Sequence, residues 1–348
     1  MGNERWKSQP KKMDEQTVTI IANQLAGLAN TQERPFSVVF HGGEPLLVGA
    51  DRFENICRIL RQILPEECAL HLQTNGILLS EKILQTCFLH DVGISISVDG
   101  PMTIHDASRV DRRGRGSHSR VLEGIRRLLC HPRGAGLFTG VLAVVDVRSN
   151  PIEVYEFLKS TGAPSIDFLY RDGNHDVLPP GKDTLLSTEY GEWMGRLLDY
   201  YLDDQTPTPI RFLDDMIKIL IGGVGRKEGV GLNDYGIVVF ETDGSITKND
   251  TLKSISASAD QFDENPSAFN CTLTDFVSSN EFFKYHEIQQ PASPICRACS
   301  YLKVCGGGMP SHRFSKERGM SNPTIFCTDQ QYLIERIKWQ LSRRAVAA

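Results

Sequence analysis

The stretch "FSVVFHGGEPLL", residues 36–47, joins a run of β-forming residues to two glycines and a glutamate. Valine and phenylalanine favour a strand, so "HGGE" places the most flexible residue type at the carboxyl end of that strand. Glycines there let a ligand approach bare backbone, and Glu44 can pair with a cationic group. The alternative is a tight strand-to-helix turn with a solvated glutamate, because a Gly-Gly-Glu motif is short and weakly specific.

Strands and helices alternate on both sides of this stretch, up to about residue 170. The first predicted helix has apolar residues at helical spacing over 18–28 and follows Asp14, a residue type that often caps helices. Further predicted helices cover residues 53–63, 80–89, 119–130 and 151–160, and predicted strands cover residues 36–40, 69–76, 94–101, 139–147 and 166–170. This alternation predicts an α/β fold with a parallel sheet, whose ligands bind at the carboxyl ends of the strands.

Two more predicted strands end in small polar residues. Thr74 and Asn75 lie in "QTNG", and Ser97 and Asp99 lie in "SVDGP". Ordinary Asn-Gly and Asp-Gly turns could account for each loop taken singly. Three such loops at one edge of a parallel sheet favour a polar ligand site.

Length and composition limit the class of protein. A chain of 348 residues, 40% of them hydrophobic, can bury a sizeable core in one large domain with an appendage, or in two domains. The formal net charge of −5 gives no reason to expect nucleic acid, and we interpret the arginine-rich "RVDRRGRGSHSR" as a solvated loop. No apolar run approaches the roughly 20 residues that span a bilayer, and no secretory signal is recognisable at the N-terminus. We therefore expect a cytoplasmic protein that does not bind membranes.

The nine cysteines fall into two groups. Cys296, Cys299 and Cys305 form a C-x2-C-x5-C set, and Cys327 follows, so four thiolates are available for a tetrahedral zinc or a 4Fe-4S cluster. Three glycines after Cys305 leave backbone N–H groups near sulfur, which suits cluster sulfides but would also suit zinc ligands. For the other five we expect packing in the core, as is usual for free cysteine: Cys57, Cys68, Cys87, Cys130 and Cys271.

The motifs "FHGGEPLL", "LQTNGILL", "ISISVDGPMTIHDASR", "GRGSHSRVLEGIRRL" and "CRACSYLKVCGGG" stand in the order of a known family. Together they resemble the radical S-adenosylmethionine enzymes with a C-terminal SPASM domain, in particular peptide maturases related to anaerobic sulfatase-maturating enzymes and cyclophane-forming maturases. The resemblance implies a partial (β/α)6 barrel over residues 1–175, a helical linker over 176–235 and a SPASM iron-sulfur domain over 236–348.

The same resemblance implies roles for the residues at the strand ends. Gly42 and Gly43 would present backbone to the amino group of S-adenosylmethionine, and Glu44 would hold that amine. Ser97 and Asp99 would contact the ribose hydroxyls, while Thr74 and Asn75 would line the cavity. The implied partners are a precursor peptide or protein substrate and an electron donor such as flavodoxin or ferredoxin.

Two departures from the family pattern concern one cluster. Family members with two auxiliary clusters carry cysteines where this chain has Met309 and Asn249. The resemblance therefore implies a single auxiliary 4Fe-4S cluster on Cys296, Cys299, Cys305 and Cys327. Asp250 is the carried-over candidate for accepting a substrate proton, with a solvated turn carboxylate as the alternative.

A third departure lies at the start of the chain. The family's C-x3-C-x2-C loop, which ligates the cluster that cleaves S-adenosylmethionine, is absent from residues 1–348, and so is the strand before it. We expect the sheet to expose an edge there, explained by a late-called start codon or a fragment, and we expect the chain as written not to cleave S-adenosylmethionine. Two functions stay open: a radical peptide maturase, or a non-catalytic relative that binds a peptide or scaffolds a cluster. A zinc-binding protein is a weaker third possibility.

Overall fold

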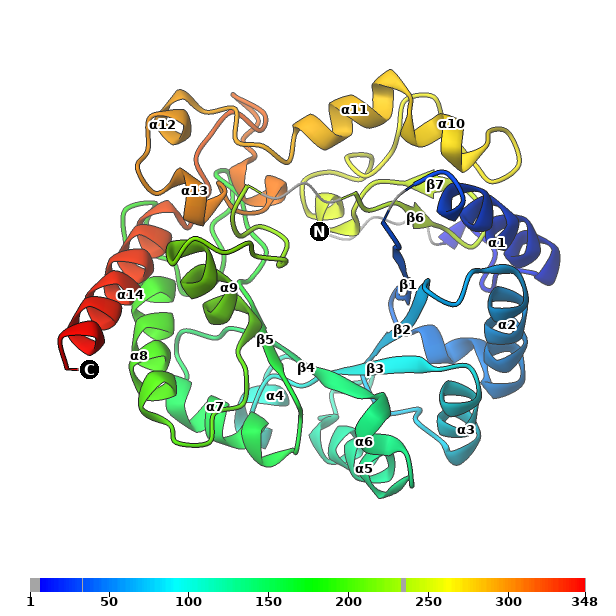
Figure 1. Ribbon diagram of the computed structural model, residues 1–348, viewed down its shortest axis with the longest axis horizontal. Helices are drawn as coiled ribbons and strands as arrows, with labels where there is room; N and C mark the ends of the chain where they lie inside the picture. Colours follow the sequence, from blue (N-terminus) through cyan, green and yellow to red (C-terminus); the bar gives the residue numbers. More distant parts are fainter. Residues whose placement is uncertain (1–6, 33, 233–235, 348) are drawn as a thin grey trace.

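The computed structural model describes residues 7–32, 34–232 and 236–347, and its centre is a five-stranded parallel sheet. The strands are β1 (Ser37–Phe40), β2 (Ala69–Thr74), β3 (Val92–Ser97), β4 (Phe138–Val144) and β5 (Ile166–Leu169), and each pairs with the next one along the chain. The sheet curves into an arc with helices on its outer side (Figure 1). The predicted α/β fold with a parallel sheet is confirmed.

Helices connect successive strands, as the alternating pattern predicts. The connecting helices are α2 (Ala50–Ile63), α3 (Glu81–Leu89), α4 (Met102–His105), α5 (His118–Cys130), α6 (Gly134–Leu137) and α7 (Pro151–Ser160), and α1 (Glu15–Ala29) precedes β1. The predicted cap of α1 is confirmed, because the Asp14 carboxylate accepts a hydrogen bond from the Thr17 backbone N–H. Val18 and Ile21 of this helix are buried, in keeping with their helical spacing.

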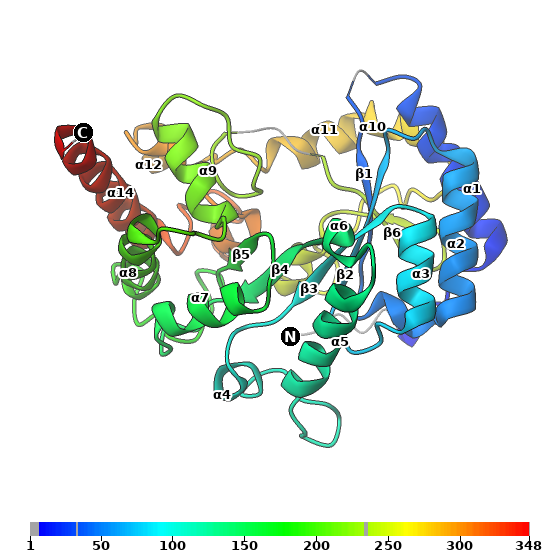
Figure 2. The same cartoon turned by 60° about the horizontal axis from the view of Figure 1, so that its bottom comes forward.

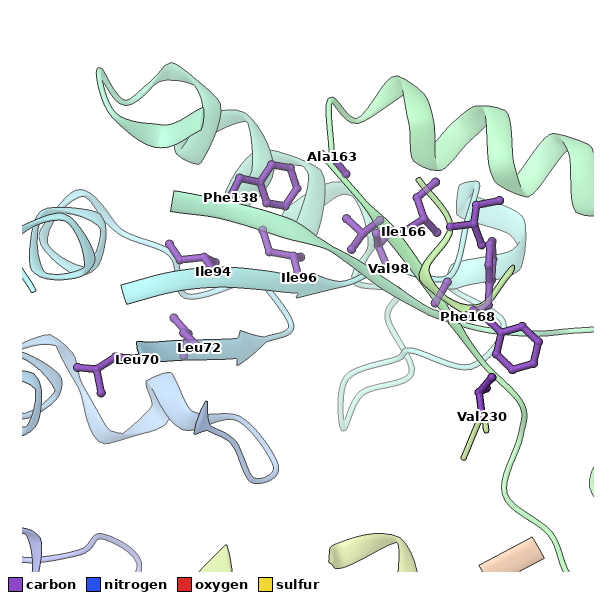
Figure 3. Packing of buried hydrophobic residues seen from close by; sticks show 14 of the residues in the cluster. Leu70, Leu72, Ile94, Ile96, Val98, Phe138, Ala163, Ile166, Phe168 and Val230 are labelled. Atoms are coloured by element: carbon purple, nitrogen blue, oxygen red, sulfur yellow. The ribbon is translucent and has the colours of Figure 1, made fainter. Parts of the chain in front are cut away.

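The two faces of the sheet differ in polarity. Along β2 and β3, Leu70, Leu72, Ile94 and Ile96 are fully buried on the outer face, against the helices (Figure 3). The alternate residues, which include His71, Gln73, Ser95 and Ser97, are only half-buried on the inner face. Because side chains alternate across a strand, this pattern gives the arc an apolar outer face and a polar, partly open inner face.

The strand β1 forms one edge of the sheet in the part of the chain that the structure describes. It pairs only with β2, and Val39 is half exposed. Among the described residues β1 is thus an edge strand, and the expected exposure of its edge stays a prediction. Five strands are seen where the resemblance implies a barrel of six.

The C-terminal half returns along the arc and contacts both of its ends. Near β5 lie α8 (Glu189–Asp203), α9 (Arg211–Leu220), α12 (Pro294–Arg297), α13 (Leu302–Cys305) and α14 (Cys327–Ala347), with α14 packed on α8 (Figure 2). Near α1 lie the hairpin of β6 (Val239–Phe240) and β7 (Ile246–Thr247), the short helix η3 (Asp250–Ser254), α10 (Leu273–Val277) and α11 (Asn280–Glu287) (Figure 1). Gln24 of α1 fastens this end, because its side chain donates to the Cys271 carbonyl and accepts from the Leu273 N–H.

The expected burial of five cysteines is confirmed for three. Cys57, Cys68 and Cys87 are buried in the core. Cys271 is half-buried, and the prediction for Cys130 is wrong because this residue is exposed. Cys130 ends α5, whose buried face is formed by Val121, Ile125 and Leu128, so Cys130 falls on the solvent side of that helix. No described helix is long and apolar enough to cross a membrane.

Candidate functional site

Glu44 connects the first two loops at the edge of the sheet where the strands end, which we call the carboxyl rim. Its carboxylate accepts hydrogen bonds from the Leu46 N–H at 3.0 Å, the Thr74 hydroxyl at 2.8 Å and the Asn75 N–H at 2.8 Å. All three donors are neutral, and no described Lys or Arg forms an ion pair with this half-buried carboxylate. Oε2 accepts only one of these bonds, so Glu44 holds the loops together and can still receive a cation.

The two glycines before Glu44 leave the rim open. Gly42 has a φ of 121°, a backbone conformation that a side chain would strain. A Cβ atom added at Gly42 or Gly43 would meet no other atom within 4 Å. Open space beside bare backbone is what the sequence predicts for a ligand-approach site.

The two predicted site residues at the end of β3, Ser97 and Asp99, have different hydrogen-bond partners. Ser97 is half-buried, and its hydroxyl oxygen accepts a hydrogen bond from the Gln73 side chain at 3.0 Å, which leaves its own O–H free to donate. Asp99 is buried and pairs bidentately with Arg109 at 2.6 and 2.9 Å, while also accepting from the Val144 N–H. Asp99 therefore braces the loop after β3 against β4, and its predicted contact with a ribose stays a prediction.

Asp250 comes to the rim from the C-terminal half. Its Oδ2 lies 3.8 Å from His41 Nδ1, and both side chains are about half exposed. His41 directly follows β1, so the structure brings Asp250 next to the "HGGE" loop, although the two lie 209 positions apart in the chain. The solvated-turn alternative for Asp250 does not predict this neighbour.

A second carboxylate, Asp172, lies near Asp250 at the carboxyl end of β5. Asp172 is partly accessible to solvent, but the surrounding protein atoms displace part of its hydration. This desolvation, followed by the negative charge of Asp250, raises the pKa of Asp172. It lines an open cavity of about 290 Å³ together with Val144, Leu169, Tyr170, Arg171 and Pro180. No hydrogen bond or ion pair joins Asp172 to another described residue.

The four C-terminal cysteines that the sequence singles out line one cavity. Cys296 lies in α12, Cys305 ends α13 and Cys327 begins α14, with Cys299 between the first two. All four thiols border this cavity, beside Gly307 and Thr324. Burial raises the pKa of Cys305 to about 12 and that of Cys327 to about 11, so without a metal these thiols stay protonated at neutral pH.

The glycine run after Cys305 is required by close packing. Gly306, Gly307 and Gly308 all have positive φ, and a Cβ atom on Gly306 would lie 1.9 Å from the Gly231 carbonyl oxygen. The Gly307 backbone N–H donates to the Cys305 sulfur, which opposes the rise in pKa of that thiol. The expectation of backbone N–H groups near sulfur is thus met at Gly307.

Among the described residues, no three His, Cys, Asp or Glu side chains are close enough together to hold a single metal ion. A 4Fe-4S cluster differs, because each thiolate binds its own iron at a separate corner of the cluster. The four thiols border one cavity, and the choice between a 4Fe-4S cluster and a tetrahedral zinc stays a prediction.

Two residues of the site were not found from the sequence. Asp172 could have been, because it follows a strand as Thr74 and Ser97 do. Arg109 gives no such signal, since its partner Asp99 lies ten positions away across an irregular loop.

The fold and these residues define a class: a parallel α/β protein with a candidate ligand site at the carboxyl ends of its strands and a separate cavity lined by four thiols. No family model matches the chain. A cysteine-type anaerobic sulfatase-maturating enzyme of Clostridium perfringens is 22% identical over 332 residues, covering 91% of this chain and 85% of that protein. A serine-type enzyme of Bacteroides thetaiotaomicron is 23% identical over 321 residues, covering 82% and 72%.

Solved structures agree on the fold. Native anSMEcpe with bound AdoMet and the Cp18Cys peptide superposes with a TM-score of 0.81 at 20% identity, covering 96% of this chain and 91% of that chain. Streptococcus suis SuiB bound to S-adenosylmethionine gives a TM-score of 0.52 at 12% identity, covering 88% and 68%. Over most of its length the chain is thus similar to anaerobic sulfatase-maturating enzymes, as the resemblance of its motifs predicts.

Proposed function

We propose that this protein is a radical S-adenosylmethionine enzyme that modifies a peptide or protein, with a ribosomally made precursor peptide as the favoured substrate. The modification would start with hydrogen abstraction and end in a crosslink or an oxidation. The observation that carries the proposal is the carboxyl rim, where an uncompensated Glu44, the open Gly42 and the proton-accepting candidate Asp250 meet. Homologues that mature sulfatases, one of them solved with AdoMet and a peptide, support it.

The residues at the rim fit S-adenosylmethionine. Glu44 would hold the cofactor's ammonium group, and the backbone at Gly42 and Gly43 would border it, since that space is open. Ser97 would donate its free O–H to a ribose oxygen. When bound, S-adenosylmethionine supplies the radical, and the protein orients it and excludes water.

The residues of this chain support one of the two iron-sulfur sites that the resemblance implies. Cys296, Cys299, Cys305 and Cys327 would hold one auxiliary 4Fe-4S cluster, because they surround one cavity. No C-x3-C-x2-C loop occurs in residues 1–348, so we assign no residue to a cluster that cleaves S-adenosylmethionine and derive no step through it. A flavodoxin or ferredoxin remains the proposed electron donor, and a location in the cytoplasm remains the proposed compartment.

Anaerobic reconstitution tests the auxiliary site. The chain should bind about four iron atoms and about four sulfides. Cys299→Ser should abolish this binding, whereas Cys130→Ser should not, because Cys130 is an exposed cysteine away from the cavity. Unchanged iron in the Cys299 variant would remove the four-cysteine assignment, and zinc without sulfide would favour a zinc-binding protein.

The second candidate is a non-catalytic relative that binds a peptide or scaffolds the cluster. It needs only the carboxyl rim and the thiol cavity, and no cleavage of S-adenosylmethionine. An anaerobic assay for 5′-deoxyadenosine with dithionite, on this chain and on a version extended by a strand and that loop, separates the two. Turnover by the extended version supports the enzyme, and inactivity of a correctly loaded one supports the non-catalytic relative.

A further inference from the structure

The thiol cavity is bordered by a polar side chain that the proposed function does not use. Gln331 lies one helical turn after Cys327 in α14, and its amide Nε2 donates a hydrogen bond to the Cys327 sulfur at 3.6 Å. Side chains four positions apart share one face of a helix and lean toward its N-terminus, so this spacing directs the Gln331 amide back to Cys327. Gln331 also lines the cavity itself, together with the four cysteines.

Two further donors reach sulfurs of the same site. The Gly307 backbone N–H donates to the Cys305 sulfur, and the Ser293 side chain donates to the Cys296 sulfur. All three donors, Gln331 included, are neutral, so they add no net charge to the site. Gln331 is the donor that a substitution can remove most cleanly, because Gly307 donates from the backbone and Ser293 is almost fully buried.

The full charges near Cys327 oppose each other. Lys182 and Asp329 both act on this thiol, but they form a buried ion pair at 2.6 Å, so the positive and the negative charge partly cancel there. The same pair is present in every variant of Gln331 and drops out of a comparison between them. The effect of a single neutral donor can therefore be measured at this site.

Hydrogen bonds to the sulfurs of an iron-sulfur cluster help to set its reduction potential. Reduction adds one electron to the cluster, and part of the added negative charge lies on its sulfur atoms. An N–H dipole that points at such a sulfur interacts more strongly with the more negative, reduced form. A donor of this kind should raise the reduction potential, and its loss should make the cluster harder to reduce.

We propose that Gln331 sets the reduction potential of the cluster in the thiol cavity, because its amide N–H bonds to the Cys327 sulfur and favours the reduced form. The inference rests on the proposed 4Fe-4S cluster and adds to it a residue that tunes its redox behaviour. One electron from a reductant converts the cluster from its 2+ to its 1+ state. No bond forms or breaks in this step, and Gln331 keeps its protons.

The test measures the midpoint potential of the anaerobically reconstituted 348-residue chain by titration with dithionite and detection of the reduced cluster by EPR. Gln331→Leu keeps a side chain of similar size but has no donor. The ratio of reduced to oxidised cluster at a fixed potential should fall about ten-fold, which is a shift of about 59 mV to lower potential. Gln331→Glu puts an anion in place of the donor and should lower the potential further. Gln85→Leu, the same change at an exposed position of α3, should leave it unchanged.

A second measurement detects the contact itself. In the unaltered chain, glutamine labelled with a magnetic isotope at the side-chain nitrogen should give a weak nitrogen coupling to the reduced cluster in pulsed EPR. The coupling should be absent from Gln331→Leu and present in Gln85→Leu. A role of Gln331 in helix packing alone would not produce this signal. If Gln331→Leu fails to hold iron, the coupling in the unaltered chain decides the question.

The remaining outcomes separate this inference from the proposed function. Equal midpoint potentials of the unaltered chain and Gln331→Leu would overturn the inference, and so would the absence of nitrogen coupling in the unaltered chain. Iron and sulfide analysis of the same preparations tests the cluster separately. A complete cluster with an unshifted potential contradicts the inference alone, whereas zinc without sulfide contradicts the proposed cluster and overturns the inference with it.

Discussion

At the scale of single residues, Glu44 both holds two loops together and carries a negative charge. Glu44→Gln keeps one oxygen for Leu46 and Thr74, but it removes the negative charge and replaces the oxygen that accepts from the Asn75 N–H by an NH2 group. Affinity for S-adenosylmethionine should fall by roughly 1 to 3 kcal/mol, the usual loss for a charge-assisted hydrogen bond. Calorimetry should show a smaller loss for Thr74→Val, which loosens the loop without removing the charge. Equal affinity of the glutamine variant and the unaltered chain would exclude Glu44 from the site.

Single residues also show which contacts of the site can be predicted from the sequence. Glu44, Thr74 and Asn75 could be predicted to meet, because the carboxyl ends of neighbouring parallel strands share one edge. The bidentate pair of Asp99 and Arg109 could not, because it depends on the path of an irregular loop. Proximity of His41 and Asp250 depends on how the C-terminal half folds back, which no local pattern encodes.

At the scale of elements, a buried ion pair links the loop before α8 to the start of α14. Lys182 Nζ lies 2.6 Å from Asp329 Oδ2, both side chains are fully buried, and Asp329 also accepts from the Gly191 N–H of α8. Asp329→Asn keeps an oxygen for Gly191 but leaves Lys182 buried without its counter-charge. The free energy of unfolding, measured in urea, should drop by about 3 to 5 kcal/mol.

A matched control is the ion pair between α8 and α14. Asp199 of α8 pairs with Arg336 of α14, but both side chains are about one third exposed. Asp199→Asn should therefore cost less than about 1 kcal/mol. Adding Lys182→Met to Asp329→Asn should recover much of the loss, and an equal loss from the single and the double variants would contradict the buried-charge explanation.

Elements before and after residue 170 differ in how well the sequence predicts them. The helices α2, α5 and α7 follow a period of 3.6, and the strands β2 and β3 follow a period of 2, because each of these elements buries one face. The helices α12 and α13 have four residues each, too few to show any period. There the cysteine spacing, not the hydrophobic pattern, predicts that the segment is structured.

At the scale of the whole molecule, the thiol cavity lies where the α12–α13 segment meets α14. Cys296, Cys299 and Cys305 come from the α12–α13 segment, and Cys327 begins α14, whose attachment to α8 is independent. Bonds from these four cysteine sulfurs to the iron atoms of one cluster would link the α12–α13 segment to α14. Metal binding to a site of this kind contributes directly to the stability of the segment that supplies the ligands.

Removal of iron from the reconstituted protein should consequently loosen one region and spare the rest. Amide hydrogen exchange should rise in residues 294–308 after anaerobic chelation, while β2 and β3 keep their protection, because the strands are held by the buried core around Leu72 and Ile94. The start of α14 should change less, since the Lys182–Asp329 pair still holds it. Cys299→Ser without iron should give the same exchange pattern as the chelated protein. Unchanged exchange in 294–308 would show that these cysteines hold no cluster, and an equal rise in β2 and β3 would show that the cluster stabilises the whole fold.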